Sequence, residues 1–126
     1  LVDVDEDVVH ETAESMGARA LTADVSDTGD VQRVVDTVIA ETGHVDVLVN
    51  NAGILRDTVL WKLTDDDWDV VLDVHLGGTF RFTRACVPHF RAQGRGRVIN
   101  VTSYAGLRGM VGQTNYSSAK AGLSTR

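Results

Sequence analysis

The sequence contains one cysteine, one proline and few aromatic residues, which make up 6% of its 126 positions. Because the single cysteine, Cys86, cannot form a disulfide within the chain, we expect a reducing compartment, the cytoplasm. A membrane-spanning helix requires about 20 consecutive apolar residues, and no apolar run in the sequence approaches that length. Hydrophobic residues nevertheless make up 43% of the chain and charged residues 24%, which is typical of one globular domain.

Positive charge is also scarce, with 12 Lys and Arg against 18 Asp and Glu. The basic residues are scattered except in residues 91–97, RAQGRGR, which we interpret as the solvated end of a helix. Because nucleic acids and anionic membranes are bound by clustered Lys and Arg, we expect neither as a partner. His10, His44 and His89 have no companions at metal-ligand spacing, so the sequence predicts no metal site.

The sequence does contain a regular alternation of helix and strand patterns. The expected helices are 5–16, 27–42, 64–74, 75–93 and 112–126, and the expected strands are a stub ending at Asp3, 18–25, 44–50 and 96–103. Residues 44–50, HVDVLVN, have the β-branched character of a strand covered on both faces. Strands separated by helices of this length predict an α/β domain with a doubly wound parallel sheet in three layers.

Several residues indicate where these helices begin and end. Gly17 is expected to stop the first helix, and Thr64 is expected to cap the third, with Asp67 at its third position. One apolar stripe in residues 27–42 predicts the buried face of the second helix: Val31, Val34, Val35, Val38 and Ile39. Pro88 should kink the helix 75–93 or mark a boundary within it.

The residues that directly follow the strands are the first candidates for a binding site. In open parallel sheets, ligands bind at the carboxyl ends of the strands. These positions are occupied by Asp3, by Asp24 and Val25, by NNAG at 50–53, and by Ser103. We expect all of them to face one crevice.

Tyr116 and Lys120 are the first candidates for catalysis. They stand four positions apart, on one face of the expected last helix. The lysine charge would favour a phenolate and lower the pKa of the tyrosine, as general acid–base catalysis requires. Ser103 could hydrogen-bond the same substrate oxygen. By itself, however, the pair could also be an ordinary contact on a helix surface.

Together these motifs resemble those of the short-chain dehydrogenase/reductase family. NNAG at 50–53, Ser103, and YSSAK at 116–120 occur in the family's order and spacing. The resemblance covers residues 1–126, which correspond to the central part of a single Rossmann-type NAD(P)-binding domain. It implies that Tyr116 donates or accepts the proton, that Lys120 binds the nicotinamide ribose and lowers the tyrosine pKa, and that Ser103 orients the substrate oxygen.

The same resemblance implies a set of cofactor-binding residues. Asp24 and Val25 would line the adenine, and the backbone of Asn51, Ala52 and Gly53 would pass beside the adenosine ribose. The alternative for residues 50–53 is a simple turn, because Asn and Gly are turn residues.

Asp3 bears on the choice between NAD and NADP. A carboxylate at the end of the second strand of this fold accepts hydrogen bonds from the ribose 2′-hydroxyl and repels a 2′-phosphate. No Lys or Arg follows Asp3 before Arg19, so NAD is favoured over NADP. The competing interpretation assigns this role to Asp5, or regards Asp3 as a solvated carboxylate at a helix start.

His75 departs from the family pattern. The family usually has an asparagine in the helix after WDVV, where it holds a water of the proton relay, whereas DVHLGGTF places His75 there. An imidazole can hold water or pass a proton near neutral pH, so His75 is a candidate catalytic residue. The alternative is a partly buried histidine at a helix start, satisfied by a backbone carbonyl.

The resemblance implies an NAD(P)-dependent oxidoreductase that transfers a hydride between nicotinamide and a carbonyl or secondary alcohol. NNAGILRD and GQTNYSSAKAG are most similar to 3-oxoacyl thioester reductases and (3R)-hydroxyacyl-CoA dehydrogenases, so we expect an acyl thioester substrate and a role in fatty acid metabolism. A generic secondary-alcohol dehydrogenase, a non-catalytic dinucleotide-binding protein and an inactive truncated product are the alternatives.

The glycine-rich loop of the family and its later substrate-binding segment are not among these 126 residues. We therefore expect a fragment that, alone, neither binds the dinucleotide tightly nor turns over. Apolar residues occupy more than one stripe of the helix 75–93, namely Leu76, Phe80, Phe82, Cys86, Val87 and Phe90. Because family members commonly pack this helix against a second subunit, we expect a homodimer or homotetramer of the full-length protein.

Overall fold

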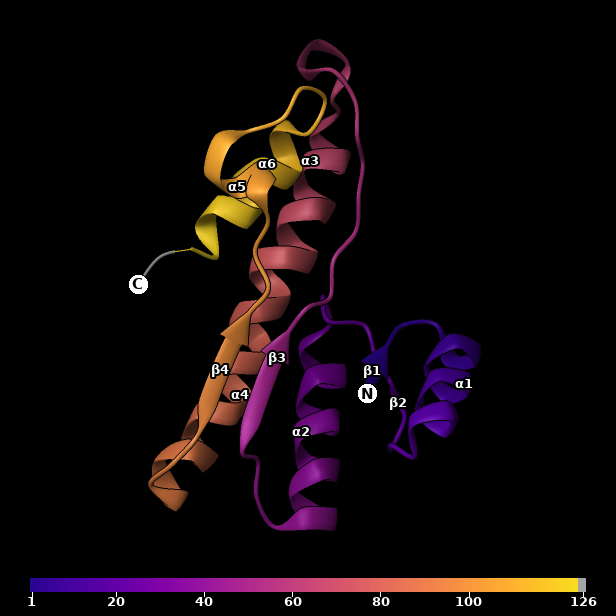
Figure 1. Cartoon of the computed structure of the whole chain (residues 1–126), viewed down its shortest axis with the longest axis vertical. Coiled ribbons are helices and arrows are strands. Elements are labelled where there is room, and N and C mark those ends of the chain that lie inside the picture. The colour runs from indigo at the N-terminus through magenta and orange to yellow at the C-terminus, as the bar shows by residue number, and fades with distance from the viewer. Residues whose placement is uncertain (125–126) are drawn as a thin grey trace.

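The computed structural model describes residues 1–124 and confirms the alternation of strands and helices (Figure 1). In chain order the elements are β1 (Val2–Asp3), α1 (Glu6–Met16), β2 (Leu21–Thr22), α2 (Thr28–Thr42), β3 (Val47–Asn50), the 3₁₀ turn η1 (Leu60–Lys62), α3 (Asp65–Leu72), the π-helical turn η2 (Asp73–Gly77), α4 (Gly78–Gln93), β4 (Arg97–Asn100), α5 (Tyr104–Arg108) and α6 (Thr114–Gly122). The strands are shorter than expected, and α5 was not predicted. The expected last helix is α6, and residues 125–126 of that prediction lie outside the described residues.

Parallel pairing of the strands is confirmed, but the single sheet that we expected is not present. β1 pairs with β2, and β3 pairs with β4, both in parallel. No strand of the described chain joins the two pairs, so they are separate two-stranded sheets. The structure is thus an α/β fold that contains part of a doubly wound arrangement.

The residues expected at helix ends act as predicted. Gly17 ends α1 with a φ of 63°, a left-handed conformation that glycine adopts at little cost. The Thr64 hydroxyl accepts a hydrogen bond from the backbone N–H of Asp67 at 3.1 Å, which caps α3. The aspartates at the start of α3 also place negative charge at the positive end of the helix dipole.

The expected boundary between helices at residues 74 and 75 is wrong. α3 continues through η2 into α4, so His75 lies inside a continuous helical segment rather than at a helix start. α4 also continues past Pro88 to Gln93, so this proline marks no boundary. Burial of Phe82 and Cys86 on the same helix anchors α4 against the core, and this packing offsets the hydrogen bond that proline removes.

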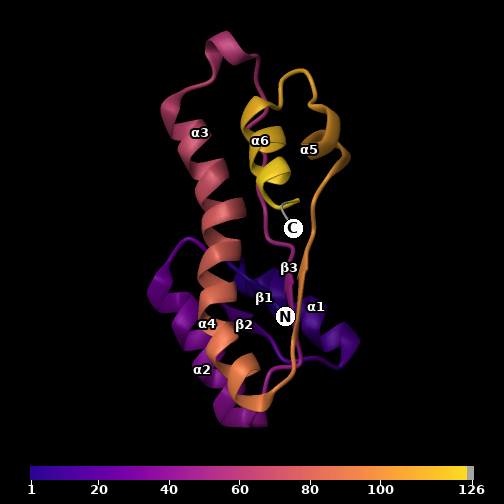
Figure 2. The same cartoon turned by 90° about the vertical axis from the view of Figure 1, so that its left-hand side faces the viewer.

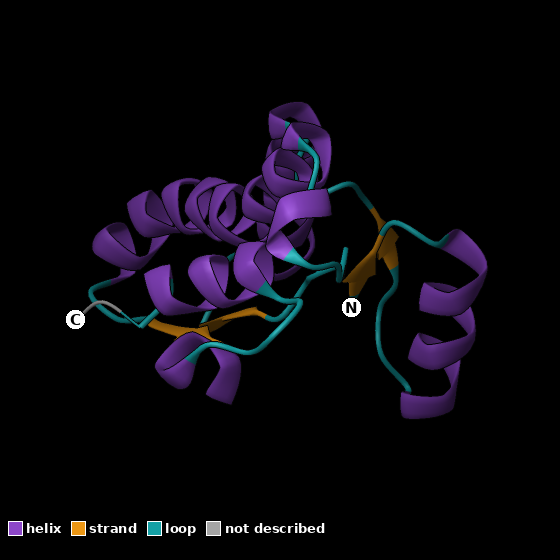
Figure 3. Cartoon of the chain, turned by 90° about the horizontal axis from the view of Figure 1, so that it is seen from above, coloured by secondary structure: helices purple, strands orange, loops and turns teal. Residues whose placement is uncertain are grey.

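The main core lies between α2, α4 and the strands. Its buried members are Ala23, Val31, Val34, Val35, Phe82 and Cys86. These include the first half of the stripe predicted for α2, and each buried valine contributes roughly 1.5–3 kcal/mol to folding. A second and smaller cluster, Val9, Ala13 and Ala20, joins α1 to β2. Viewed from above, α1 lies apart from the other helices, beside β1 and β2 (Figure 3).

The prediction that both faces of the strand 44–50 are covered is wrong for this structure. Leu48 packs against the main core, whereas Val49, on the opposite face, is 54% exposed. The pattern alternates because successive side chains of a strand point to opposite faces, and α4 covers only one of them.

The carboxyl ends of β3 and β4 point toward one end of the molecule. There α5 and α6 lie side by side, and α3 packs against α6 (Figures 1 and 2). Three segments from distant parts of the chain therefore meet beyond the strand ends: the loop after β3, the loop after β4, and the helical segment around η2.

Candidate active site

A cavity of about 460 Å³ lies beyond the carboxyl ends of β3 and β4. Its lining comes from four segments of the chain and consists of Asn51, Gly53, Ile54, Leu55, His75, Val101, Thr102, Tyr116 and Lys120. Of the residues predicted for catalysis, Tyr116, Lys120 and His75 therefore meet at one cavity. Of those predicted for the cofactor, Asn51 and Gly53 join them.

Lys120 is held in a buried position next to Tyr116. Its side chain is 4% exposed, and Nζ donates a hydrogen bond to the backbone oxygen of Val101 at 2.6 Å. Burial lowers the pKa of this lysine, because the charged ammonium loses hydration. Nζ lies 5.8 Å from the ring centroid of the half-buried Tyr116, one helical turn earlier. An ammonium has three donors, so Lys120 can serve further acceptors in the cavity.

His75 is the second buried neighbour of Tyr116. The two rings meet edge to face, with centroids 5.3 Å apart and an interplanar angle of 77°. The π-helical turn η2 carries the histidine, and such turns frequently occur at functional sites. Gly53 makes this placement possible, because a Cβ on Gly53 would lie 2.1 Å from His75 Cε1.

The two nitrogens of His75 have different surroundings. Nε2 lies 3.0 Å from the carbonyl oxygen of Ile54 and 3.2 Å from its N–H, so either tautomer finds a backbone partner there. Nδ1 is buried and has no partner among the described residues. The imidazole is 2% exposed, and burial lowers its pKa; the bond to Ile54 opposes this shift, and the charge of Lys120 adds to it. The histidine is thus bound by the backbone at one nitrogen, and its other nitrogen has no hydrogen-bond partner among the described residues.

Ser103 stands at the N-terminal end of α5. Its Oγ accepts a hydrogen bond from the backbone N–H of Ala105 at 3.2 Å and caps α5, and Ser103 is not part of the cavity lining. Thr102 lines the cavity instead, and its hydroxyl donates to the Lys120 carbonyl at 2.8 Å. A serine hydroxyl that accepts one bond still has its own proton to donate, so the cap alone does not remove its hydrogen-bonding capacity.

The expected single crevice is also wrong for the residues after the first two strands. Asp3, Asp24 and Val25 do not line the cavity, because Asp3 ends β1 and the other two follow β2, which pair in a separate sheet. The carboxylate of Asp3 accepts from the N–H of Asp5 at 3.0 Å, and that of Asp24 accepts from the N–H and hydroxyl of Ser26.

Val25 and Ala52, which were also predicted for the cofactor site, lie outside the cavity lining. Val25 lies against Gly78 at the start of α4, where a Cβ on the glycine would be 2.8 Å from Val25 Cγ2. Ala52 is exposed beside the cavity but not part of its lining.

Sequence reasoning missed residues that act through the backbone. Ile54 and Val101 contribute carbonyl oxygens that hold His75 and Lys120, and a carbonyl leaves no signal in residue type. Thr102 could have been considered, because the sequence predicted a strand over 96–103, in which adjacent side chains face opposite ways and only one of Thr102 and Ser103 would point toward a given side.

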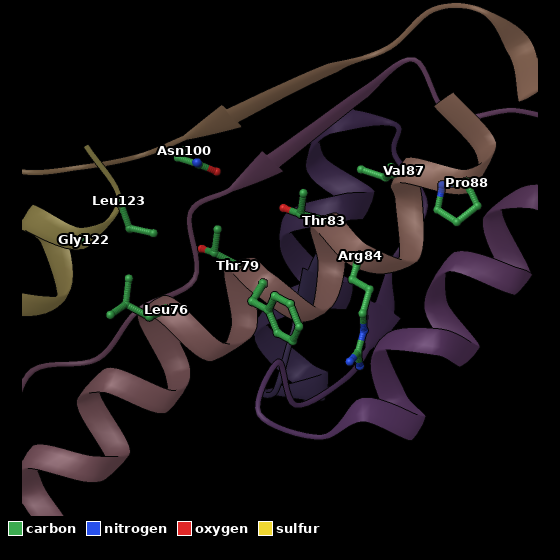
Figure 4. A pocket seen from close by; sticks show the side chains of 10 residues that line it. Leu76, Thr79, Thr83, Arg84, Val87, Pro88, Asn100, Gly122 and Leu123 are labelled. Atoms are coloured by element: carbon green, nitrogen blue, oxygen red, sulfur yellow. The ribbon is translucent and has the colours of Figure 1, made fainter. Parts of the chain in front are cut away.

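A second cavity, of about 490 Å³, lies along α4 (Figure 4). It is bounded by α4, the end of β4 and the last turn of α6, and its lining is mostly apolar. The guanidinium of Arg84 lies 4.8 Å from the ring centroid of Phe80 at this groove. Its lining contains no His, Tyr, Lys or carboxylate, so the first cavity is the candidate for proton transfer. Within residues 1–124, no three potential ligands gather as a metal site, and no helix has the length and apolarity to cross a membrane.

The chain is similar in sequence to several known proteins. The chain is 45% identical over 116 residues to the peroxisomal hydratase-dehydrogenase-epimerase of Neurospora crassa, covering 92% of the chain and 13% of that protein. It is 44% identical over 99 residues to the 3-oxoacyl-[acyl-carrier-protein] reductase FabG of Thermotoga maritima, and 46% identical over 99 residues to the acetoacetyl-CoA reductase of Cupriavidus necator. Each of these two alignments covers 79% of the chain and 40% of the relative. The chain therefore spans less than half the length of these relatives. The family model described as short chain dehydrogenase matches residues 1–125, and the chain belongs to this family.

Proposed function

We propose that the full-length protein containing this chain is a nicotinamide-dependent oxidoreductase that interconverts the 3-oxo and 3-hydroxy forms of an acyl thioester. The observation that carries the proposal is the placement of Tyr116 at a cavity together with the buried Lys120 and His75, which both lie within 6 Å of its ring centroid. The names of similar proteins support the substrate class, since they include a 3-oxoacyl-[acyl-carrier-protein] reductase and an acetoacetyl-CoA reductase.

The residues of the cavity fit a nicotinamide cofactor. The Lys120 ammonium has donors beyond its bond to Val101, as binding of ribose hydroxyls would require. The buried Nδ1 of His75 lacks a partner among the described residues and suits a water or a hydroxyl group. When bound, the nicotinamide supplies or accepts the hydride.

The proposed mechanism assigns a separate task to each side chain. In the direction of reduction, the Tyr116 hydroxyl donates its proton to the substrate oxygen as that oxygen becomes an alcohol. Lys120 stabilises the negative charge that develops on the phenol oxygen. Because burial lowers the His75 pKa, the imidazole is neutral near pH 7 and can accept a hydrogen bond from a water at Nδ1. That water could then return a proton to the Tyr116 oxygen. Ser103 would orient the substrate oxygen with its hydroxyl proton.

We further propose NAD rather than NADP as the cofactor. Asp3 is exposed at the end of β1, and the N–H of Asp5 donates to one of its carboxylate oxygens, so the other oxygen can accept from a ribose hydroxyl. Asp24 and Val25 would line the adenine, and the exposed segment of Asn51, Ala52 and Gly53 would pass beside its ribose. A cytoplasmic location and a homodimer or homotetramer remain proposals, and the names of some relatives include the word peroxisomal.

The test is an assay of the purified full-length protein with acetoacetyl-CoA and either NADH or NADPH, followed by the absorbance of the reduced nicotinamide. We expect turnover with the thioester, at least tenfold lower kcat/KM with simple ketones, and a preference for NADH. Tyr116→Phe should lower kcat by roughly 10²–10⁴-fold. Tyr104→Phe is the matched control, because Tyr104 is exposed and outside the cavity lining.

Two outcomes would contradict the proposal. One is absence of turnover with any thioester, and the other is full activity of Tyr116→Phe. Equal or better activity with simple ketones would favour a generic secondary-alcohol dehydrogenase, and a preference for NADPH would overturn the role of Asp3. Binding of NADH without turnover of any substrate would favour a non-catalytic dinucleotide-binding protein.

A further inference from the structure

Asn115 is a fully buried polar residue that directly precedes Tyr116. Its exposed fraction is 0%, which is uncommon for asparagine. A buried amide is expensive unless its hydrogen bonds are satisfied, so a residue of this kind is usually retained for a specific contact.

The Asn115 side chain joins three segments of the chain. Its amide nitrogen donates to the backbone oxygens of Arg56 and Asp67, both at 3.1 Å. Its Oδ1 accepts from the backbone N–H of Tyr116 at 2.8 Å. Both N–H donors and the oxygen of the amide are thus used. The three bonds connect the first turn of α6 to the loop after β3 and to α3.

The bond to the Tyr116 N–H compensates for a missing cap. The first N–H groups of a helix have no partner within the helix. Gln113, which precedes α6, makes no side-chain cap bond, and Asn115 instead satisfies the N–H of Tyr116 from within the first turn. The Asn115 side chain therefore bonds both to the backbone of Tyr116 and to the two neighbouring segments.

These neighbouring segments hold the rest of the cavity. Arg56 lies two residues after Ile54, whose backbone binds His75, and Asp67 belongs to α3, which runs into the turn that carries His75. Loss of the Asn115 amide would remove both side-chain bonds from α6 to the loop after β3 and to α3, and would free α6 to shift relative to both segments. The distance between the Tyr116 and His75 rings depends on that relative position.

We infer that Asn115 is a positioning residue for Tyr116, which sets the tyrosine against His75 and the reacting oxygen by fixing α6 to α3 and to the loop after β3. Asn115 itself is not part of the cavity lining. The expected effect on turnover rests on the proposed function. The expected effect on the position of Tyr116 rests only on the three hydrogen bonds of Asn115.

The test compares matched amide-to-acid substitutions in the full-length protein. Asn115→Asp keeps the shape and removes both N–H donors, and Gln113→Glu makes the same chemical change at a partly exposed amide that bonds to Asp57 at 2.7 Å. Asn115→Ser is a neutral second variant in case the aspartate prevents folding. Because a misplacement of about 1 Å can cost about 100-fold in rate, we expect kcat of the Asn115 variants to fall roughly 30–100-fold, with KM for NADH changed less than threefold. Gln113→Glu should keep kcat within threefold.

A second measurement does not depend on turnover. In protein with labelled His and Tyr, nuclear Overhauser contacts between the rings of His75 and Tyr116 should be present in the wild type and in Gln113→Glu, and lost in Asn115→Ser. If the wild-type protein turns over no substrate, the proposed function fails, and this contact still decides the inference. Asn115 variants with unchanged kcat, with only a raised KM, or with an intact ring contact would overturn the inference. It would also fail if neither variant folded, because Asn115 would then be required for folding itself.

Discussion

The two ends of the molecule are stabilised in different ways. The N-terminal unit, residues 1–22, is joined by two short paired strands and a small apolar cluster of Val9, Ala13 and Ala20. The cavity end contains His75, Asn115 and Lys120, all buried and all hydrogen-bonded to backbone groups far away in sequence. The proposed catalytic end is therefore held by buried polar side chains that bond to distant backbone groups, whereas the N-terminal unit is held by local strand pairing and small apolar contacts.

Replacement of Lys120 should separate activity from stability most clearly. Lys120→Met keeps the apolar length of the side chain and removes the ammonium, so we expect kcat of the full-length protein to fall by roughly 100-fold or more. The free energy of unfolding should change by less than about 1 kcal/mol. Burial lowers the pKa of Lys120 because it disfavours the ammonium, so removal of that charge also removes its desolvation cost. Steady-state kinetics and urea unfolding at pH 7 measure the two effects.

The matched control is Lys62→Met, which removes an exposed lysine on η1 and should change neither quantity. Retained turnover in Lys120→Met would contradict the role of the ammonium. A large loss of stability with unchanged kcat would instead make Lys120 a structural residue.

Two glycines allow the cavity end to be compared with α2, outside the cavity, by the same substitution. In Gly53→Ala, the new Cβ would lie 2.1 Å from His75 Cε1, so either the ring or the loop must move. We expect a loss of about 1–3 kcal/mol in the free energy of unfolding, as for other overpacked sites, with a lower kcat. In Gly29→Ala, on the first turn of α2, the nearest atom is Asp27 Oδ1 at 3.1 Å, and we expect a change below about 1 kcal/mol.

Urea unfolding of the two variants gives the comparison directly. Equal losses in both would show that the loop after β3 adapts around His75 and that the cavity end is less tightly packed than its contacts indicate.

The sequence predicted most of what depends on apolar pattern and local capping. The stripe of Val31, Val34 and Val35, the stop at Gly17 and the cap at Thr64 follow from periodicity and turn chemistry, which act within a few residues. Spacing also predicted that Tyr116 and Lys120 share a helix face. The fold class and parallel pairing followed from the alternation of elements.

Features that depend on distant contacts were not predictable from pattern. The π-helical turn at Asp73–Gly77 leaves no periodic signal, so a helix boundary was expected where the chain continues. The burial of Asn115 depends on carbonyl groups 48 and 59 residues away. The exposed face of β3 was missed because β-branched residues indicate a strand but do not say what covers it.

The smallest effect that we predict is the one of His75 on the pH dependence of the free energy of unfolding. Burial lowers its pKa in the folded state, so between that value and about 6.5 the unfolded chain binds a proton that the folded chain does not. Stability is therefore complete above about pH 6.5 to 7 and decreases as the pH falls through this window, by at most about 1.4 kcal/mol per pH unit for one proton.

The measurement is urea unfolding of the full-length protein between pH 5 and 7.5, together with His75→Asn and, as the control from the N-terminal unit, His10→Asn. The slope should disappear in His75→Asn, because asparagine does not titrate, and it should persist in His10→Asn, because His10 is exposed on α1. An unchanged slope in His75→Asn would mean that the imidazole is not buried in the neutral form. His75 could then not serve as the neutral acceptor beside Tyr116 that the proposed proton relay requires.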